Sequence, residues 1–349
     1  MVSIALLPGD GVGPEVLEGP TELARQLAAV GAVEVTGPWP VGASSFGATG
    51  EGLPAETLTA CEAADAILLG AVGEHPGVPL GDYRPELALI SLRVHFDLRV
   101  SVRQVWRGER PPMTVVRNLL GGAYATASRV ESDGTGPASD LFELEPARIR
   151  ELAQIAIGYA KTSDLPLVSV DKANLLATSR LWRRSVSELA EEHGVPVRHV
   201  YVDRMAYEIA ASGPPEAIVL TEGLFGDILS DLACGRAGSI ALCGSASIRP
   251  GDSIGDGRRC VGLFEPVHGS APMRAGQGKV NPAGGYLALA ALLEWFPETA
   301  KWAEVVREAL GEALAGSPLT YDLAPAGTTP ASTAELAARI NALAAERIR

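Results

Sequence analysis

Two aspartates, Asp227 and Asp231, stand four residues apart in the run FGDILSD at 225–231. If this stretch is helical, both carboxylates lie on one face, where like charges destabilise the helix unless a cation sits between them. Carboxylate oxygens suit Mg²⁺ or Mn²⁺ better than Zn²⁺. Taken alone, the pair fits equally well a solvated acidic face near a helix start, which the helix dipole favours.

A lysine and three arginines add to this signal. Lys172 follows the apolar run Val168–Val170, and α/β enzymes place their sites at the carboxyl ends of strands. A lysine near a metal and other cations can lose its proton and act as a base, although a single lysine is more often a surface residue. Planar guanidinium groups bind carboxylates through paired hydrogen bonds, so three arginines suit a substrate with two carboxylates. The candidates are Arg93, Arg103 and Arg117.

Two glycine-containing loops are candidates for nucleotide binding. Gly9-Asp10-Gly11-Val12-Gly13 follows an apolar run, but its third glycine comes one residue early for the dinucleotide fingerprint. The second apolar run ends at Gly37–Pro40 without the acidic residue that such a fold requires, which argues against an orthodox Rossmann domain. The run FEPVHGSAP at 264–272 has small residues and free backbone N–H groups that can wrap a nucleotide. By itself, its His268 is more often structural.

The elements that would position these residues alternate between strand and helix, which predicts an α/β protein with a largely parallel sheet. Polar, glycine-rich stretches at 126–145 and 248–262 are predicted loops. The predicted strands are 2–7, 33–37, 66–72, 113–117, 166–171, 197–202, 217–221 and 238–243. The predicted helices are 14–30, 54–64, 146–162, 175–192, 224–234, 284–295, 301–315 and 332–347.

Composition excludes several classes of function. The 349 residues carry a net charge of −13, which repels nucleic-acid phosphates and anionic membranes, so neither is an expected partner. No apolar run approaches the roughly 20 residues of a membrane span. The four cysteines form no CxxC pair and are interpreted as buried reduced thiols. With no basic segment at the N-terminus, a cytoplasmic protein is expected.

Together these segments resemble the β-decarboxylating dehydrogenase family, which includes the isocitrate, isopropylmalate, homoisocitrate and tartrate dehydrogenases. The matching runs keep the family's order and spacing across nearly the whole chain. They are LLPGDGVGPEV at the start, PELALISLR at 85–93, RNLLGGAY at 117–124, VSVDKANLL at 168–176, YVDRMA at 201–206, LFGDILSDLA at 224–233 and FEPVHGSAP at 264–272.

The resemblance implies an isopropylmalate dehydrogenase-like α/β fold with two lobes on an open, mostly parallel sheet covered by helices on both faces. The first lobe would comprise residues 1–99 and 252–349, and the second residues 100–251. A homodimer with shared active sites is also implied, as are Mg²⁺ or Mn²⁺ and NAD or NADP as cofactors. The implied reaction is oxidative decarboxylation of a 3-substituted malate.

Matching positions carry the family's roles onto this chain. Arg93, Arg103 and Arg117 would hold the substrate carboxylates, with Lys172 from the partner subunit as the base and Tyr124 as the acid. The implied metal ligands are Asp227 and Asp231 with Asp203 from the partner subunit. The implied cofactor-binding residues are Val12, Gly70, Ala71, Glu86, Glu265, His268, Gly269, Ser270, Ala271, Pro272, Met273, Arg274, Asn281 and Tyr321.

The segment before Arg93 touches the substituent that distinguishes the family's substrates. Here Leu87, Leu89 and Ile90 make it apolar, which favours 3-isopropylmalate, the substrate converted to 4-methyl-2-oxopentanoate and CO₂ in leucine biosynthesis, over isocitrate. An alternative is a paralogue in secondary metabolism that acts on another alkylmalate, a homoisocitrate-like acid or a phosphonate analogue, which Arg84 would contact. A second alternative is a non-catalytic subunit of a dehydrogenase complex, although the base, the acid and all metal ligands are present.

Several residues depart from the family's pattern. Asn118 stands where Glu usually follows the arginine, Gly223 stands where Asn is usual, and the stretch 248–262 is longer than in relatives. Met273-Arg274 replaces the Asp-Ile of NAD-using relatives. Because that Asp repels a 2′-phosphate and Arg274 can pair with one, NADP is the expected preference. Tyr321 lies in a Thr-Tyr-Asp run like that of NADP-using isocitrate dehydrogenases.

Overall fold

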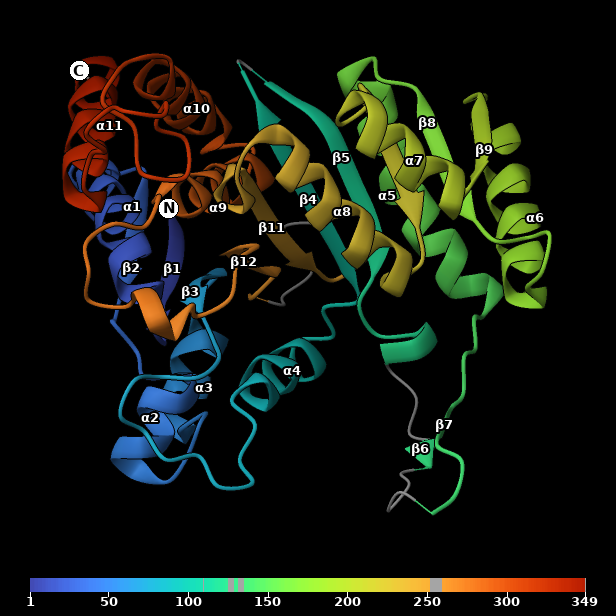
Figure 1. The fold of residues 1–349 in the computed structure, drawn as a ribbon, viewed down its shortest axis with the longest axis horizontal. Helices are drawn as coiled ribbons and strands as arrows, with labels where there is room; N and C mark the ends of the chain where they lie inside the picture. Colours follow the sequence, from blue (N-terminus) through green and yellow to red (C-terminus); the bar gives the residue numbers. More distant parts are fainter. Residues whose placement is uncertain (109, 125–128, 131–134, 252–258, 349) are drawn as a thin grey trace.

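A computed structural model describes residues 1–348, apart from 109, 125–128, 131–134 and 252–258. Its centre is one sheet with the strand order β2-β1-β3-β12-β11-β4-β5-β10-β8-β9 (Figure 1). The strands are β1 (Val2–Gly9), β2 (Val33–Thr36), β3 (Ala66–Ala71), β4 (Val100–Arg107), β5 (Arg110–Asn118), β8 (Leu167–Asp171), β9 (Val197–Tyr201), β10 (Ala217–Thr221), β11 (Cys243–Ile248) and β12 (Gly262–Pro266). A separate small sheet pairs β6 (Arg129–Val130) with β7 (Ser139–Asp140).

Most neighbouring strands are parallel, and the antiparallel pairs all lie in the middle of the sheet. There β11 runs antiparallel to both β12 and β4, and β4 runs antiparallel to β5. Successive β1 residues pack on opposite sides, with Ile4 and Leu6 in one core cluster and Ala5 and Leu7 in another. A strand buried on both faces is typical of parallel sheets covered by helices.

Helices cover both faces of the sheet, as Figure 1 shows. On one face α1, α5, α6 and α9 pack in the largest core cluster, with α10 against α9 and α11 against α1. On the other face α3 and α4 pack beside β1 and β3, and α7 and α8 pack beside β5 and β10. The helices are α1 (Gly13–Ala29), α2 (Gly42–Thr49), α3 (Ala55–Ala63), α4 (Glu86–His95), α5 (Pro146–Ser163), α6 (Ala177–Glu192), α7 (Val202–Ser212), α8 (Gly223–Ala237), α9 (Ala283–Trp295), α10 (Ala300–Ala315) and α11 (Thr333–Ile348).

The predicted α/β class and the covering of both faces are confirmed, whereas one predicted strand is wrong. Residues 238–243 do not form a strand, because Gly238 ends α8 and a short 3-10 helix follows at Ile240–Leu242. The strand begins only at Cys243. The run at 264–272 is also not all loop, since its first three residues belong to the fully buried β12. Within the part of the chain that is described, no helix is long and apolar enough to cross a membrane.

Candidate active site

Two of the predicted substrate arginines extend from the same face of the sheet. Arg117 on β5 lies opposite Ser101 on β4, two residues before Arg103. Side chains two residues apart on a strand share a face, and residues directly opposite point the same way. Both arginines are buried, and α8 packs on this face against β4 and β5. The sheet therefore holds two buried cations beneath α8.

The carboxylates of α8 meet these cations. One terminal nitrogen of Arg103 lies 3.0 Å from Asp227 Oδ1 and 3.2 Å from Asp231 Oδ1, and a terminal nitrogen of Arg117 lies 3.0 Å from the same Asp227 oxygen. Burial raises the pKa of Asp231, and the neighbouring Asp227 charge adds to the rise while Arg103 opposes it. Ser230 accepts a further hydrogen bond from Arg103 at 2.7 Å. The predicted helical spacing thus places both aspartates beside the arginines.

The third arginine is linked to the same face of the sheet by an ion pair with a carboxylate of β12. Arg93, in the last turn of α4, forms an ion pair of 2.8 Å with Glu265. Ser245 on β11 pairs with Glu265 on one side and with Arg103 on the other, so the three residues form one row across three strands. Leu89 and Ile90 precede Arg93 on α4 by four and three residues, which puts them on its side of the helix. Leu89 is half-buried and Ile90 is exposed.

The predicted base lies with the remaining predicted metal ligand. Lys172 follows β8 and Asp203 lies in the first turn of α7, and their side chains are joined by a hydrogen bond of 2.5 Å. That bond lowers the pKa of Asp203. Behind them, the buried Asp171 accepts two hydrogen bonds from Arg183, which fixes the end of β8. Among the described residues, no three metal-binding side chains come together, so Asp203 does not complete a site with Asp227 and Asp231 of its own chain.

Tyr124, the predicted acid, is the last residue of a short 3-10 helix, Gly122–Tyr124, that follows β5. Its side chain is outside the described part of the structure. The segment before it is anchored by two backbone hydrogen bonds, from Leu119 N–H to the carbonyl of Arg99 and from Gly122 N–H to the carbonyl of Glu143. Tyr124 therefore belongs to the segment that follows the carboxyl end of β5, the strand that carries Arg117.

The predicted cofactor residues from three separate segments lie side by side. Val12 donates its N–H to the carbonyl of Ser270 at 2.8 Å, and the N–H of Asp10 bonds the carbonyl of Ala71 at 2.7 Å. Gly11 has φ +57°, and a Cβ there would lie 2.0 Å from the Ser270 carbonyl oxygen, so only glycine fits. Gly70 is equally confined, by the carbonyl of Pro8. The β1–α1 turn, the end of β3 and the loop after β12 thus form one backbone cluster.

The far side of this cluster contains buried polar atoms without partners among the described residues. They are His268 Nε2, Thr320 Oγ1 and Asp322 Oδ1. Burial lowers the pKa of His268, which favours its neutral form. The Asn281 amide donates to the other oxygen of Asp322 at 3.0 Å. Unpaired buried donors and acceptors need a partner, and the edge of a purine base or a ribose offers both kinds of group. These residues therefore fit a nucleotide.

The residues predicted to choose between NAD and NADP are close together. The Arg274 guanidinium lies over the ring of Tyr321, 4.4 Å from its centroid. Met273 is 87% exposed and no acidic side chain occupies its position. Glu86, the remaining predicted cofactor residue, is exposed at the first position of α4. Gly269 and Ala271 flank Ser270, and Pro272 opens the short 3-10 helix that carries Met273 and Arg274.

Sequence reasoning missed three carboxylates that organise the site. The fully buried Asp10 accepts hydrogen bonds from the backbone N–H groups of Ala43, Ser44 and Gly73. Glu222 caps α8 through the N–H groups of residues 224 and 225, and burial raises its pKa. Asp322 joins Asn281 to the loop that contains Tyr321. Asp10 lies in the run Gly9–Gly13 and Asp322 in the run Thr-Tyr-Asp, both of which the sequence analysis had identified. Their position in these runs was the available sign of a role in the site.

The pair on α8 fits a divalent metal. Both side chains offer hard oxygen donors, and a single guanidinium nitrogen already lies near both carboxylates, which shows that they converge on one cation-sized position. Two carboxylates are fewer than a complete coordination shell needs. Further oxygens would come from the substrate and from another carboxylate.

Comparison with known proteins agrees with this geometry. The model of the isocitrate/isopropylmalate dehydrogenase family matches residues 3–340. The 3-isopropylmalate dehydrogenase of Synechococcus sp. (strain CC9902) is 38% identical over 94% of this chain and 95% of its own length. That of Salinibacter ruber is 38% identical over 99% of this chain and 96% of its own length.

Solved structures show the same fold. A β-decarboxylating dehydrogenase from Thermococcus kodakarensis superposes with a TM-score of 0.82 at 30% identity, covering 99% of this chain and 97% of the other. The isocitrate dehydrogenase of Methylococcus capsulatus gives a TM-score of 0.84 at 28% identity, covering 99% of both chains. The sequence-based prediction of the family is confirmed: this chain belongs to the isocitrate/isopropylmalate dehydrogenase family of decarboxylating oxidoreductases.

Proposed function

We propose that the enzyme converts 3-isopropylmalate to 4-methyl-2-oxopentanoate and CO₂. The observation that carries this is the row Arg93–Glu265, Ser245 and Arg103, with Arg117 beside it, facing the carboxylates of α8. Cations suited to two carboxylates therefore lie next to Leu89 and Ile90, which suit an alkyl group. The curated relatives named 3-isopropylmalate dehydrogenase, at 35–38% identity, support the same choice.

Each part of the reaction is assigned to residues of this chain. The three arginines hold the two carboxylates, which orients the hydroxyl at C2. Lys172 accepts the hydroxyl proton, and Tyr124 donates a proton to C3 after the 3-carboxylate has left as CO₂. Asp227 and Asp231, with Asp203 of the partner subunit, would hold Mg²⁺ or Mn²⁺. The bound metal would supply Lewis-acid polarisation of the C2 oxygen, and NAD or NADP would supply the hydride acceptor.

We also propose a homodimer in which Lys172 and Asp203 of one subunit complete the site formed by Asp227 and Asp231 of the other. The support is a set of exposed apolar side chains next to both halves of the site: Leu175 (70% exposed), Tyr207 (64%) and Ile228 (59%). Each lies within four residues of Lys172, Asp203 or Asp227 in the chain, and exposed apolar groups around a functional site are typical of protein–protein contacts. Lys172 and Asp203 bond each other within the chain, and among the described residues Asp203 does not join Asp227 and Asp231 in one metal-binding group.

Two further assignments belong to this proposal. The lobes would comprise residues 1–99 with 252–349 and residues 100–251, which agrees with a strand order that places β1, β2, β3 and β12 on one half of the sheet. The enzyme would act in the cytoplasm, where its four free buried cysteines would stay reduced.

Substrate choice tests the proposed function directly. With Mn²⁺ and either cofactor, 3-isopropylmalate is expected to give the highest kcat/KM, measured by NAD(P)H absorbance. Other 3-alkylmalates are expected to follow within about 10–200-fold, because one or two methylenes in an apolar pocket contribute only roughly 1–3 kcal/mol. A clear preference for isocitrate, or for a malate with a phosphonate group, would assign the pocket to an anionic substituent instead.

For the cofactor, we propose that the enzyme accepts NADP in preference to NAD, with Arg274 and Tyr321 at the 2′-phosphate. The stacked pair places a cation and a hydroxyl together on the adenosine side, and position 273 carries no carboxylate to repel the phosphate. Arg274→Ala is expected to lower kcat/KM for NADP about ten-fold or more and to leave that for NAD nearly unchanged, since a charge-assisted contact contributes roughly 1.5–3 kcal/mol.

Lys279→Ala is the matched control for this experiment. Lys279 is exposed in the same loop, so its removal changes the net charge without touching the stacked pair. An enzyme that prefers NAD, and whose preference is the same in Arg274→Ala, would show that these residues take no part in choosing the cofactor.

A further inference from the structure

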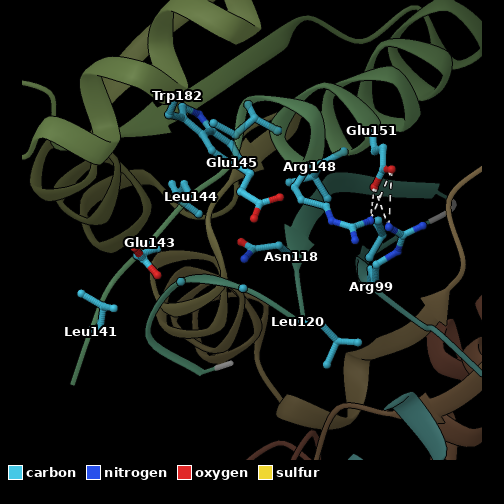
Figure 2. Close-up of a pocket in the computed structure, with 15 residues that line it drawn as sticks. Arg99, Asn118, Leu120, Leu141, Glu143, Leu144, Glu145, Arg148, Glu151 and Trp182 are labelled. Carbon is cyan, nitrogen blue, oxygen red and sulfur yellow. Dashed lines mark hydrogen bonds and ion pairs between the residues drawn. The ribbon is translucent and has the colours of Figure 1, made fainter. Parts of the chain in front are cut away.

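Two places outside the substrate arginines carry polar groups that the proposed reaction does not use. One is a pocket of about 370 Å³ beside Asn118 (Figure 2). Arg99 and Arg148 each lie 3.2 Å from the carboxylate of Glu151 there, so the lining mixes charges and favours neither an anion nor a cation. The other place is His75, in the segment between β3 and α4, which lies against the cofactor cluster.

The glycine turn between β1 and α1 uses its backbone N–H groups within the protein. Each N–H of residues 10–13, all of which are described, donates a hydrogen bond to another part of the chain. In chain order, the acceptors are the carbonyl of Ala71, Nδ1 of His75 and the carbonyls of Ser270 and Asp10. Nucleotide-binding turns usually bind their ligand through free N–H groups. Polar contacts to the cofactor at this turn must therefore come from side chains.

The bond from Gly11 determines which nitrogen of the His75 ring carries the proton. An N–H group only donates, so Nδ1 accepts from Gly11 at 3.1 Å, and the neutral ring carries its proton on Nε2. Among the described residues Nε2 has no hydrogen-bond partner, and the His75 side chain is 32% exposed. His75 thus presents an accessible N–H donor at the cofactor cluster.

The segment that carries His75 is held against the turn and points toward the substrate residues. Gly73 donates its N–H to the buried Asp10 at 3.1 Å. Further along the segment, Tyr83 stacks on Phe46 of α2 with the ring centroids 4.1 Å apart. The segment then leads directly into α4, the helix of the proposed alkyl pocket. His75 therefore lies in the part of the chain that joins the cofactor cluster to the substrate residues.

The charges around His75 favour an uncharged acceptor over a phosphate. Asp10 Oδ1 lies 4.0 Å from Nδ1, and the neighbouring Glu74 is exposed. Like charges at such distances repel, so both carboxylates disfavour a phosphate beside the ring. The part of the cofactor that must approach the substrate is the nicotinamide, because it accepts the hydride. Its carboxamide oxygen is a neutral hydrogen-bond acceptor.

We propose that His75 donates its Nε2–H to the carboxamide oxygen of the bound nicotinamide and thereby orients the ring that accepts the hydride. This inference rests on the proposed function, because it assigns a contact to the cofactor of that reaction. The bond from Gly11 sets both the tautomer and the orientation of the imidazole. The glycine turn would thus act on the cofactor through His75 rather than through its own N–H groups.

Two substitutions separate this contact from a purely structural role of the ring. Asn places an amide oxygen near the position of Nδ1, so His75→Asn keeps the acceptor for Gly11 and loses the distal donor. His75→Gln does the reverse, because its longer side chain brings an N–H donor near the position of Nε2. Isothermal titration calorimetry of the full-length enzyme with NADH compares their affinities, and thermal unfolding checks that both variants fold.

His75→Asn is expected to bind NADH about five-fold more weakly than the native enzyme, as is typical for the loss of one neutral hydrogen bond. His75→Gln is expected to lose less, although it lacks the acceptor for Gly11. Native affinity in His75→Asn, or a loss no larger than that of His75→Gln, would overturn the proposal.

Two analogues locate the acceptor on the cofactor. Thio-NADH has sulfur, a weak acceptor, in place of the carboxamide oxygen, and ADP-ribose lacks the nicotinamide altogether. His75→Asn is expected to bind each analogue about as tightly as the native enzyme does. A loss for either analogue as large as that for NADH would place the donor elsewhere and refute the assignment. Because these titrations contain no substrate, a preference for isocitrate would contradict the proposed function and leave the affinities unchanged.

Discussion

Replacing Lys172 with methionine is expected to lower kcat by about 10²–10⁴-fold, because the substitution removes the only proposed acceptor of the hydroxyl proton. Cofactor binding should persist, since the residues around Val12 and Ser270 belong to a separate part of the fold. The measurements are steady-state turnover and the quenching of NADH fluorescence on binding. Lys161→Met, at an exposed position of α5, is the matched control.

Subunit mixing separates a shared site from one formed within a chain. Lys172→Met and Asp227→Asn are each expected to be inactive, yet a heterodimer of the two would contain one intact site. Random exchange should therefore restore about a quarter of the native specific activity, because half the dimers are mixed and each has one working site of two. Exchange that is verified by mass but restores nothing would show that Lys172 serves its own chain.

The second large effect is expected from the metal ligands. Asp227→Asn keeps the shape of the side chain and removes its charge, so Mn²⁺ should bind more weakly and kcat at fixed Mn²⁺ should fall roughly a hundred-fold or more. Raising the Mn²⁺ concentration should recover part of the loss. Free Mn²⁺ measured by electron paramagnetic resonance gives the affinity without reference to turnover.

Two controls accompany this variant. Asp164→Asn makes the same change at an exposed helix end with φ +56°, a conformation that asparagine tolerates, and should leave activity and Mn²⁺ affinity unaltered. Thermal unfolding checks that the variant keeps its fold. This control is needed because Asp227 pairs with the buried Arg103 and Arg117 beneath α8. Full activity of the native enzyme in excess EDTA would contradict a metal-dependent reaction altogether.

The helices and strands that were predicted correctly from the sequence are those with one clear pattern of apolar residues. β1, β3, β8 and β10 are mostly apolar, and α5, α6 and α11 have clear apolar stripes, so both kinds of element were placed nearly to the residue. The antiparallel strand β4 was missed because Ser101, Arg103 and Gln104 interrupt its apolar run, although Arg103 is one of the proposed substrate-binding residues. β12 was taken as loop for the same reason, since Glu265 and Pro266 stand at its end.

The candidate site was predicted from residue spacing and family resemblance rather than from the local structural preferences of the chain. The four-residue interval of Asp227 and Asp231 required only a helix, and α8 supplies it. The row that joins Arg93 to Arg103 through Glu265 and Ser245 depends on the register of β4 with β11 and β12, which lie far from β4 in the chain. No local pattern contains that register. The roles of the buried Asp10 and the half-buried Asp322 depend in the same way on tertiary neighbours.

The strand order has a consequence for synthesis of the protein. β3 and β4 follow each other in the chain but are not neighbours, because β12 and β11 lie between them in the sheet (Figure 1). On the ribosome, β3 and β4 therefore emerge with one edge each that has no native partner. The edge of β4 waits for β11, and the edge of β3 waits for β12. Unpaired strand edges are templates for aggregation, and long-range pairing closes slowly. We therefore expect the nascent chain to be most prone to aggregation between translation of β4 and translation of β12.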